Sequence, residues 1–400
     1  MDLIHPDSPL VRRVLAGVPV ATAIARRDEM LLAVLREHDW DFAVTSYFER
    51  GLQAWRAHQQ IVRLFLPHDR EIDVLDFAAG FGRATRFLAM EHGAAHVWVS
   101  DIQQDALAFQ QQLFGVNALL SSGRPEEFSS HKRFACVTAH SFFSHTPPHL
   151  FAPWLTTLNA CVEPGGILVF SVHDESLLPL TSHGALGITF RKTSETDRID
   201  VEQYGSTWVS KSFVESAVAT ACPGKSLFHW PRGLANFQDL YVVYSSDRRT
   251  GDGSLDQGPF GYASICREFG NQLDMIGWVS HWNPARKVSR VVIDLGEKVI
   301  AEVDSFFPRR DVVDLLGDAR HLQSGWHARF ELPAECSEST DVLAIRAVSD
   351  LGNENFLFVG TIAGLMLQSA RAELRAAGRE AVLFLDQTAS DPLAGQYESS

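Results

Sequence analysis

The sequence predicts an α/β fold in which a doubly wound parallel sheet is preceded by a helical cap and followed by an antiparallel β-sandwich. Between residues 72 and 172, short apolar runs alternate with helix-like segments, and the runs lack polar alternation, as expected of strands covered on both faces. After residue 258 the apolar period changes to two, which indicates half-buried antiparallel strands. The 400 residues exceed what one compact core usually needs, so we expect two or three domains.

Changes in composition place the boundaries of the predicted domains. Residues 1–65 carry apolar residues at helical spacing and are assigned to the N-terminal cap, and residues 66–246 to the doubly wound domain. Residues 247–258 are polar and contain Gly, Asp and Arg, so we interpret them as a linker. The sandwich is predicted over 259–361, and 362–400 are predicted to form a C-terminal helix and a frayed tail.

The predicted elements follow one another in a simple order. Apolar runs predict strands of the parallel sheet at 72–77, 97–101, 118–120, 134–139 and 166–172, with a further strand at 240–244. Helix-like segments separate them, including one that begins near Pro147 and one from about 209 to 221. Sandwich strands are predicted at 288–295, 298–303, 326–332 and 342–348. The pair Gly296-Glu297 between the first two of these indicates a hairpin.

Composition and charge exclude several classes of protein. The net charge is -14 and no run of Lys and Arg opposes it, so a nucleic acid is a poor partner. The five cysteines are scattered and include no C-x-x-C pair, so neither a disulfide framework nor a metal site is implied. The N-terminus lacks a signal pattern, and no apolar stretch reaches the roughly 18 residues that span a bilayer. We therefore predict a soluble, cytoplasmic protein.

The segment Ala78–Gly82, which reads Ala-Ala-Gly-Phe-Gly, is the strongest candidate for a ligand-binding loop. It follows the predicted strand at 72–77 and precedes a helix, so it lies where doubly wound sheets bind ligands. Glycine lets the backbone approach a ligand closely, and the helix N-terminus offers unpaired N–H groups. The loop therefore predicts a nucleotide-like ligand.

Three further residues narrow the choice of ligand. Asp76 ends the strand four residues before Gly80, where a carboxylate can accept hydrogen bonds from an ammonium group. Asp101 ends the next strand, 19 positions beyond Gly82, and is suitably placed for both hydroxyls of a ribose. A dinucleotide fingerprint would need glycine where Thr85 stands. These residues favour a nucleoside that carries an amino acid over NAD.

Four segments resemble motifs of the class I SAM-dependent methyltransferases, in the order in which that family has them. Residues 74–83 resemble its first motif, and Asp101 matches its ribose-binding acid. Residues 134–141 resemble its fourth strand, and 163–168 resemble its Pro-Gly-Gly turn into the fifth. The resemblance covers about residues 66–245 and implies a Rossmann-like sheet, S-adenosylmethionine as cofactor and methyl transfer as the activity.

The resemblance also implies a set of cofactor-binding residues. They are Tyr47, Asp76, Ala78, Gly80, Gly82, Asp101, Ile102, Ser122, Ala139 and His140. Ala78 stands where the family's first motif has a glycine. The family often has an acid after the third strand that meets the adenine amine, whereas this chain has backbone around Gly123 and the Ser122 side chain as candidates. Tyr47 resembles part of an N-terminal helix that closes over the cofactor, and simple packing is the alternative.

A base is needed if the methyl acceptor is a hydroxyl, because the proton must leave as the new bond forms. His140, His145, His173 and Asp174 follow the fourth and fifth predicted strands, where side chains face the methyl group. Histidine titrates near neutrality, so we predict His145 first and His173 second as the catalytic base. Residues 182–204 suit a substrate loop or, equally, a surface insertion.

Part of the C-terminal domain resembles a β-sandwich module that is appended to some bacterial glycosyltransferases. The resemblance spans about 270–360 and rests on the segments 276–279, 291–295, 308–312 and 324–326. It implies a fold rather than an activity. Trp282 or Trp326 could stack on sugar rings, with core packing as the alternative.

The sequence thus predicts a SAM-dependent methyltransferase that acts on a hydroxyl group of a sugar or glycan. One alternative is a methyltransferase of a small metabolite or protein, in which the sandwich serves assembly. The other is a non-enzymatic scaffold or glycan-binding protein with the same fold. The sequence leaves open whether the chain forms a homo-oligomer.

Overall fold

The computed structural model describes residues 3–67, 70–193, 200–245 and 255–376. Contacts divide the chain into two units. Unit 1 comprises Met1–Asp7, Gly17–Val34 and Tyr47–Gln257, and unit 2 comprises Ser8–Ala16, Leu35–Ser46 and Gly258–Ser400. Most of the predicted linker and of the predicted tail lies outside the described residues, and the predicted domain boundaries stay a prediction.

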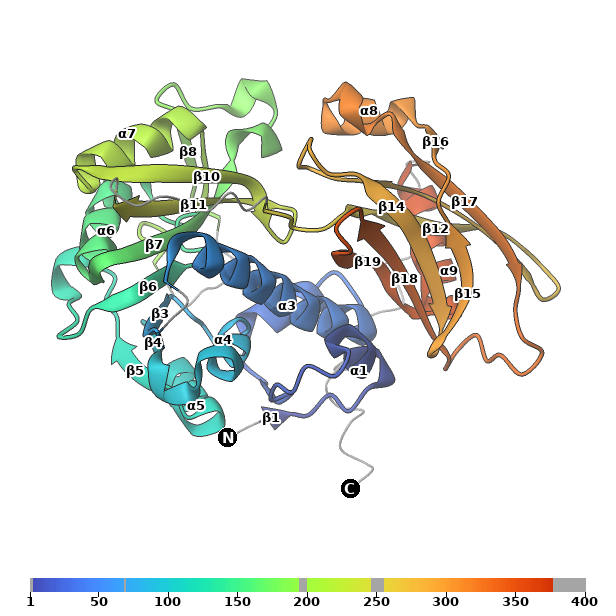
Figure 1. The fold of residues 1–400 in the computed structure, drawn as a ribbon, viewed down its shortest axis with the longest axis horizontal. Coiled ribbons are helices and arrows are strands. Elements are labelled where there is room, and N and C mark those ends of the chain that lie inside the picture. Colours follow the sequence, from blue (N-terminus) through green and yellow to red (C-terminus); the bar gives the residue numbers. More distant parts are fainter. Residues whose placement is uncertain (1–2, 68–69, 194–199, 246–254, 377–400) are drawn as a thin grey trace. The chain divides into compact units, whose positions relative to one another are not determined.

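A twisted sheet forms the centre of unit 1 (Figure 1). Its parallel strands, in spatial order, are β5 (Asn117–Leu120), β4 (Val97–Asp101), β3 (Val74–Phe77), β6 (Phe134–Ala139) and β7 (Val162–Asp174). Antiparallel partners extend the sheet beyond β7 as β11 (Gln238–Ser245) and β10 (Lys225–Leu234), while β9 (Ser206–Val209) pairs with the end of β7 and with β8 (Ile188–Arg191). The strand order reverses between β3 and β6, so the predicted doubly wound sheet is confirmed.

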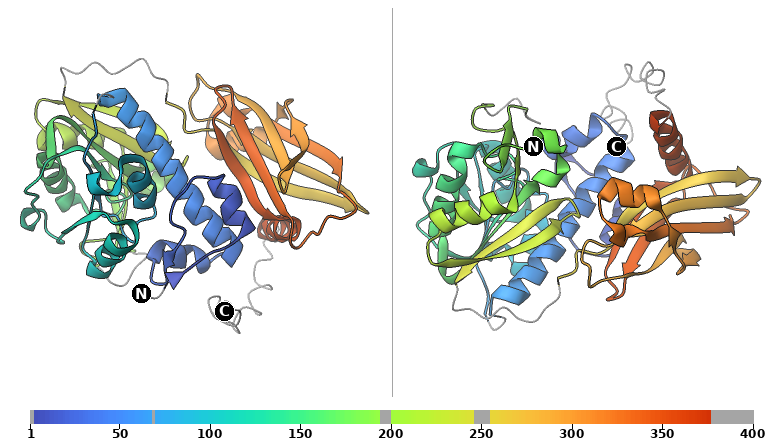
Figure 2. Two further views of the ribbon diagram at one scale, coloured as in Figure 1. Left: turned by 60° about the horizontal axis from the view of Figure 1, so that its bottom comes forward. Right: turned by 90° about the horizontal axis from the view of Figure 1, so that it is seen from above.

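Helices cover both faces of this sheet (Figures 1 and 2). They are α3 (Trp40–Phe65), α4 (Thr85–His92) and α5 (Gln104–Phe114) on one face, and α6 (Pro148–Ala160) and α7 (Lys211–Ala221) on the other. Val74 of β3 belongs to the apolar cluster with α3 and α4, and Leu75 belongs to the cluster with α6 and α7. Because side chains alternate along a strand, Asp76 faces the same side as Val74.

The remaining elements of unit 1 are short. They are β1 (Leu3–Ile4), β2 (Ile24–Ala25), the part of α2 (Glu29–Leu35) up to Val34, and 3-10 turns at Ala94–His96, Pro125–Glu127, Glu175–Leu177 and Leu180–Ser182. Helix α6 begins one residue later than predicted, with Pro147 as its N-cap. Strands β8, β9 and β10 are not predicted from the sequence. In β10 the apolar pattern is broken by Pro231 and Arg232, and its pairing with β11 is irregular after Trp230.

Two antiparallel sheets form the sandwich-like body of unit 2, as predicted. One consists of β12 (Phe260–Phe269), β13 (Gln272–Ser280), β17 (Gln323–Glu331) and β16 (Phe307–Pro308); the other of β15 (Lys298–Val303), β14 (Val288–Leu295), β18 (Val342–Ser349) and β19 (Glu354–Thr361). Its helices are α1 (Pro9–Leu15), α8 (Arg310–Leu316), a 3-10 turn at Ala319–His321 and α9 (Ile362–Ala376). The predicted hairpin is present between β14 and β15, where Gly296 has a φ of 60°.

The two tryptophans considered for sugar stacking have different environments in unit 2. Trp326 is completely buried in the core between the sheets, so core packing is its role. Trp282 is partly exposed, and its ring stacks on Phe260 with centroids 4.4 Å apart. A sugar-binding role for Trp282, and the resemblance to the glycosyltransferase module, stay predictions.

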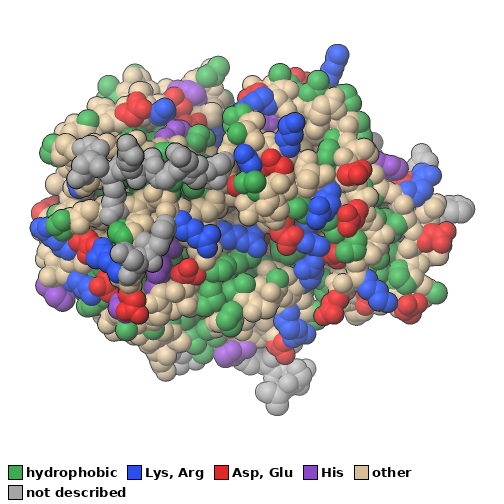
Figure 3. Space-filling view, viewed as in Figure 1, with side chains coloured by type: hydrophobic (Ala, Val, Ile, Leu, Met, Phe, Trp, Pro, Cys, Tyr) green, Lys and Arg blue, Asp and Glu red, His purple; other side chains and the backbone are tan. Residues whose placement is uncertain are grey.

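The surface offers few further clues to function. Lys and Arg side chains are interspersed with Asp and Glu on the face that Figure 3 shows. No helix in the described ranges is long and apolar enough to cross a membrane. All five cysteines lie in the described ranges, and none forms a disulfide.

Candidate active site

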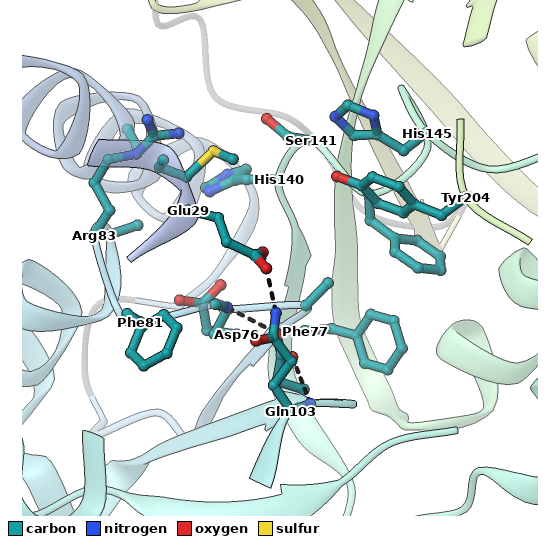
Figure 4. A pocket seen from close by; sticks show the side chains of 18 of the residues that line it. Glu29, Asp76, Phe77, Phe81, Arg83, Gln103, His140, Ser141, His145 and Tyr204 are labelled. Atoms are coloured by element: carbon teal, nitrogen blue, oxygen red, sulfur yellow. Dashed lines mark hydrogen bonds between the residues drawn. The ribbon is translucent and has the colours of Figure 1, made fainter. Parts of the chain in front are cut away.

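A pocket of about 450 Å³ opens in unit 1 at the carboxyl ends of the parallel strands (Figure 4). Its volume is that of sites for small molecules. The lining comes from α2 and α3, from the loop after β3, from the segments after β4 to β7, and from the turn between β10 and β11. The strand order reverses at this edge of the sheet, which is where doubly wound sheets bind ligands.

The predicted loop Ala78–Gly82 has an unusual backbone. Ala78, Gly80 and Gly82 all have positive φ angles, of 56°, 54° and 79°. A Cβ atom on Gly82 would lie 2.5 Å from the Phe114 ring and 2.7 Å from Gln110, whereas one on Gly80 would meet nothing within 4 Å. Gly82 therefore allows the loop to pack on α5, and Gly80 leaves the pocket open. The left-handed conformation costs Ala78 on the order of 1–3 kcal/mol, as is common where backbone serves a ligand.

Asp76 is a buried carboxylate at the end of β3, with 3% of its surface exposed. It accepts hydrogen bonds from the hydroxyls of Thr85 (2.7 Å) and Thr138 (3.2 Å). Burial raises the pKa of Asp76 to about 6, although both hydrogen bonds lower it. A carboxylate held in this way is complementary to a cationic ligand.

Asp101 ties the glycine loop to the end of β4. Its carboxylate accepts hydrogen bonds from the backbone N–H groups of Gly80 (2.8 Å) and Gln103 (2.9 Å). Burial raises the pKa of Asp101, while these hydrogen bonds lower it. Gln103 in turn donates to Glu29 of α2 at 3.2 Å, and both side chains line the pocket (Figure 4). Three acidic side chains, those of Glu29, Asp76 and Asp101, thus line the pocket near the glycine loop.

The other predicted cofactor residues fall into two groups. Those that line the pocket are Ala78, Ile102, Ser122 and His140. Tyr47, Gly82 and Ala139 are not among the described lining residues. Tyr47 is buried and donates to the carboxylate of Asp28 at 2.6 Å, and Asp28 itself lines the pocket. The cofactor roles of these residues stay predictions.

His145 follows β6, and a hydrogen bond to the backbone of Gly205 orients its ring. Its Nδ1 lies 2.7 Å from the carbonyl oxygen of Gly205, and its ring stacks on Tyr204 with centroids 4.5 Å apart. A carbonyl can only accept, so Nδ1 carries the proton of the neutral ring and Nε2 carries the lone pair. The ring therefore has the tautomer of a general base that acts through Nε2.

In His173 of β7, the Nε2 atom accepts a hydrogen bond from a neighbouring side chain. The Oε1 atom of Gln238 accepts hydrogen bonds from the hydroxyls of Ser171 (2.6 Å) and Ser141 (3.2 Å), which orients its amide. The amide NH₂ group then donates to Nε2 of His173, at 3.2 Å. The lone pair of Nε2 of His173 is therefore engaged, and the catalytic roles of His145 and His173 stay predictions.

The two other candidates for the base have different positions. His140 lines the pocket, and burial lowers its pKa to about 4. The Nδ1 atom of His140 is buried and has no hydrogen-bond partner among the described residues. Asp174 is not among the described lining residues, and it caps a short turn by accepting from the N–H of Ser176.

The structure adds lining residues that the sequence analysis does not assign. Those with polar or aromatic side chains include Asp28, Glu29, Arg50, Arg83, Trp154, Phe237 and Gln238. Arg83 makes no hydrogen bond or ion pair with any described residue, and Figure 4 shows it on the same side of the pocket as His140. Arg83 directly follows the glycine loop in the sequence, so its position could have identified it as a lining residue. Phe237 and Gln238 depend on the turn after β10, which the sequence does not predict.

The segment 182–204 contributes its last residues to the site. Gln203 and Tyr204 line the pocket, and residues 194–199 lie outside the described part of the chain. Arg191 is exposed, in β8, with its guanidinium 5.3 Å from the ring centre of Trp208. The role of this segment as a substrate loop stays a prediction.

Part of the chain is similar to known proteins. Residues 74–166 match the model of a family described as a methyltransferase domain. No curated protein matches the sequence. Among solved structures, DesVI of Streptomyces venezuelae is similar at 15% identity and a TM-score of 0.38, over 50% of this chain and 95% of that one. The glycopeptide N-methyltransferase MtfA is similar at 13% identity and a TM-score of 0.34, over 48% of this chain and 90% of that one. DhpI in complex with SAH is similar at 16% identity and a TM-score of 0.37, over 55% of this chain and 97% of that one.

The family match places the site in a known class of enzyme. It begins at β3 and includes the glycine loop, Asp76, Asp101 and His145. The geometry of the site does not depend on this match. The buried carboxylate of Asp76 and the backbone of the glycine loop, which Asp101 holds through the N–H of Gly80, line the same pocket. The chain therefore contains a methyltransferase domain over residues 74–166.

Proposed function

We propose that the chain transfers the methyl group of S-adenosylmethionine to a hydroxyl of a sugar or glycan, with His145 as the base. The observation that carries this proposal is the hydrogen bond from Nδ1 of His145 to the carbonyl of Gly205 at 2.7 Å. It leaves the lone pair of the neutral ring at Nε2. A hydroxyl acceptor needs such a group to remove its proton, whereas an amine acceptor that is already neutral does not.

Residues on the other side of the pocket suit the parts of the cofactor. We assign its ammonium group to Asp76, whose buried carboxylate accepts from two hydroxyls of the described residues, and its ribose hydroxyls to Asp101. Arg83 lines the pocket and interacts electrostatically with Asp28, and its guanidinium suits the carboxylate of the cofactor. Ile102 and Ser122 suit the adenine, because both line the pocket beyond β4 and β5.

The chain's own residues position the acceptor and move one proton. The cofactor supplies an electrophilic methyl group on a sulfonium. His145 accepts the hydroxyl proton at Nε2, and the carbonyl of Gly205 stabilises the imidazolium because it still accepts from Nδ1. His140 and His173 stay neutral at pH 7, because burial lowers the pKa of each to about 4. Neutral rings avoid repulsion of the cationic sulfonium.

The acceptor is tested with methyl-labelled S-adenosylmethionine and fractionated cell material. We expect the label in the saccharide fraction. Label confined to proteins or to other small metabolites would contradict the sugar acceptor. Binding of the cofactor without label in any fraction would contradict hydroxyl methylation.

The base is tested with His145→Gln, and His173→Gln serves as the matched control. We expect His145→Gln to lower kcat by about 10²–10⁴-fold, the range of general-base catalysis, with an unchanged Kd for the cofactor. The pH dependence of kcat should flatten on its acidic side in this variant. His173→Gln should keep that pH dependence. An equal loss of kcat in both variants would refute the assignment.

A further inference from the structure

The charged side chains of the pocket all come from one part of the sequence. They are Asp28, Glu29, Arg50, Asp76, Arg83 and Asp101. The described lining residues after position 120 include no Asp, Glu, Lys or Arg. Ser122 is assigned above to the adenine, and the lining residues from Ser141 onward, which include His145, belong to the part of the pocket that we assign to the acceptor. Among the described lining residues on that side, a charged group of the acceptor would therefore lose water without gaining an ionic partner.

Four ring side chains form a continuous row on this uncharged wall, and we call it the ring row. Tyr204 stacks on His145 with centroids 4.5 Å apart, and Figure 4 shows the two side by side. His145 meets the edge of His173 at 6.1 Å, and His173 meets the edge of Phe237 at 5.4 Å. All four line the pocket. Such a surface suits the face of a flat or ring-shaped group.

Phe237 is presented by a strained turn. Ala235 and Asn236 both have left-handed backbones, with φ angles of 54° and 56°, and the N–H of Phe237 bonds to the carbonyl of Leu234 at 3.0 Å. Two positive φ angles in succession are typical of the tight type I′ hairpin turn. Strain of this kind persists where surrounding contacts hold it, and it is often found at functional sites.

Arg232 and Asp239 hold this turn in place. The guanidinium of Arg232 donates to the carbonyl of Phe237 at 2.7 Å and to the hydroxyl of Ser176 at 2.8 Å. Asp239 accepts from the backbone N–H of Arg232 at 2.9 Å. Phe237 nevertheless keeps 44% of its surface exposed. A rigid turn that holds an aromatic ring partly in water, against a pocket, is a contact surface for a ligand.

We propose that the acceptor is an uncharged ring that bears the hydroxyl, and that it packs on the ring row with Phe237 as its outer contact. This inference rests on the proposed function, because it names the acceptor class of the same site. It excludes acceptors whose reacting ring carries a carboxylate, a phosphate or an ammonium group. A neutral saccharide and an aromatic alcohol share the proposed chemistry, and the experiment separates them.

The experiment measures binding rather than turnover, so that it does not depend on methyl transfer. Calorimetry of the full chain, saturated with S-adenosylhomocysteine, is carried out with methyl glucoside, phenol, glucuronic acid and glucosamine. The three sugars share one ring and differ in charge. We expect methyl glucoside to bind more tightly than either charged sugar. Tighter binding of phenol than of methyl glucoside would assign the site to aromatic alcohols.

Phe237 is tested in the same assay. Phe237→Ala should weaken binding of the neutral ring by about tenfold, the upper range for one aromatic contact, and Phe237→Tyr should restore it. Leu351→Ala is the control, since Leu351 is 57% exposed and lies in unit 2. The inference is overturned if a charged sugar binds as tightly as methyl glucoside and phenol, if neither neutral ring binds, or if Phe237→Ala binds like the unchanged chain. A neutral ring that binds but accepts no methyl group would support the inference and count against the proposed function.

Discussion

Replacing Asp76 with asparagine should stabilise the ligand-free protein and weaken its binding of S-adenosylmethionine. Burial raises the pKa of Asp76 from 3.8 to about 6, so the folded state holds this proton more tightly than the unfolded chain does. Stability from this group is complete below pH 3.8 and is lost as the pH rises through 6. At pH 7.5 the carboxylate is ionised in the folded and in the unfolded state, and the folded state is destabilised by the full free energy of burying that charge.

The size of the effect follows from the shift in pKa. A shift of about two units corresponds to about 3 kcal/mol at pH 7.5. An asparagine of the same shape avoids this cost. Its oxygen can still accept from Thr85, and its NH₂ group can donate to Thr138, whose hydroxyl then donates to the carbonyl of Leu75 at 3.4 Å. The same change would remove the proposed charge-assisted hydrogen bond to the ammonium group, and such a bond contributes about 1.5–3 kcal/mol to binding.

Urea unfolding at pH 7.5 and pH 4.5, without cofactor, measures the first effect. Asp76→Asn should be more stable by up to about 3 kcal/mol at pH 7.5, and the difference should shrink at pH 4.5 because Asp76 is then protonated. Calorimetry should show about 10–100-fold weaker binding of S-adenosylmethionine at pH 7.5. Asp311→Asn is the control with the opposite sign, because Arg309 lowers the pKa of Asp311. A variant that is less stable at pH 7.5, or that binds the cofactor normally, would refute the reasoning.

Two further substitutions test the loop and the sandwich. Gly82→Ala should lower the free energy of unfolding by about 1–3 kcal/mol, because its Cβ would meet Phe114 and Gln110 at a φ of 79°. Gly80→Ala should lower stability less than Gly82→Ala, because its Cβ would enter open space and only the strain of a φ of 54° remains, and it should weaken cofactor binding. Equal losses of stability for the two variants in urea unfolding, or unchanged cofactor binding of Gly80→Ala in calorimetry, would contradict this account. Trp326→Ala should lower stability by about 3–5 kcal/mol in urea unfolding, and a change below 1 kcal/mol would show that the sandwich core is misassigned.

The parts of the site that follow a local pattern were predictable from the sequence. The strand before the glycine loop is a short apolar run, and Asp76 and Asp101 stand at strand ends in chain order. Parallel strands bring such ends to one edge of a sheet, so their proximity follows from the pattern alone. Strand β10 could not be predicted, because proline and arginine interrupt its apolar pattern. The strand forms because it pairs with β11, and this pairing is not visible in the local sequence.

The sequence by itself determined the doubly wound sheet and the glycine loop with its two carboxylates, because each depends on residues close together in the chain. The tertiary structure decided the surroundings of His145 and Phe237. The tautomer of His145 depends on a carbonyl sixty positions away, and Phe237 reaches the pocket only through the turn after β10. It also placed Trp326 in a core and left Trp282 partly exposed, although the sequence offers the same alternatives for both. Contacts between distant segments determine which atoms of a side chain are engaged, and no local pattern records them.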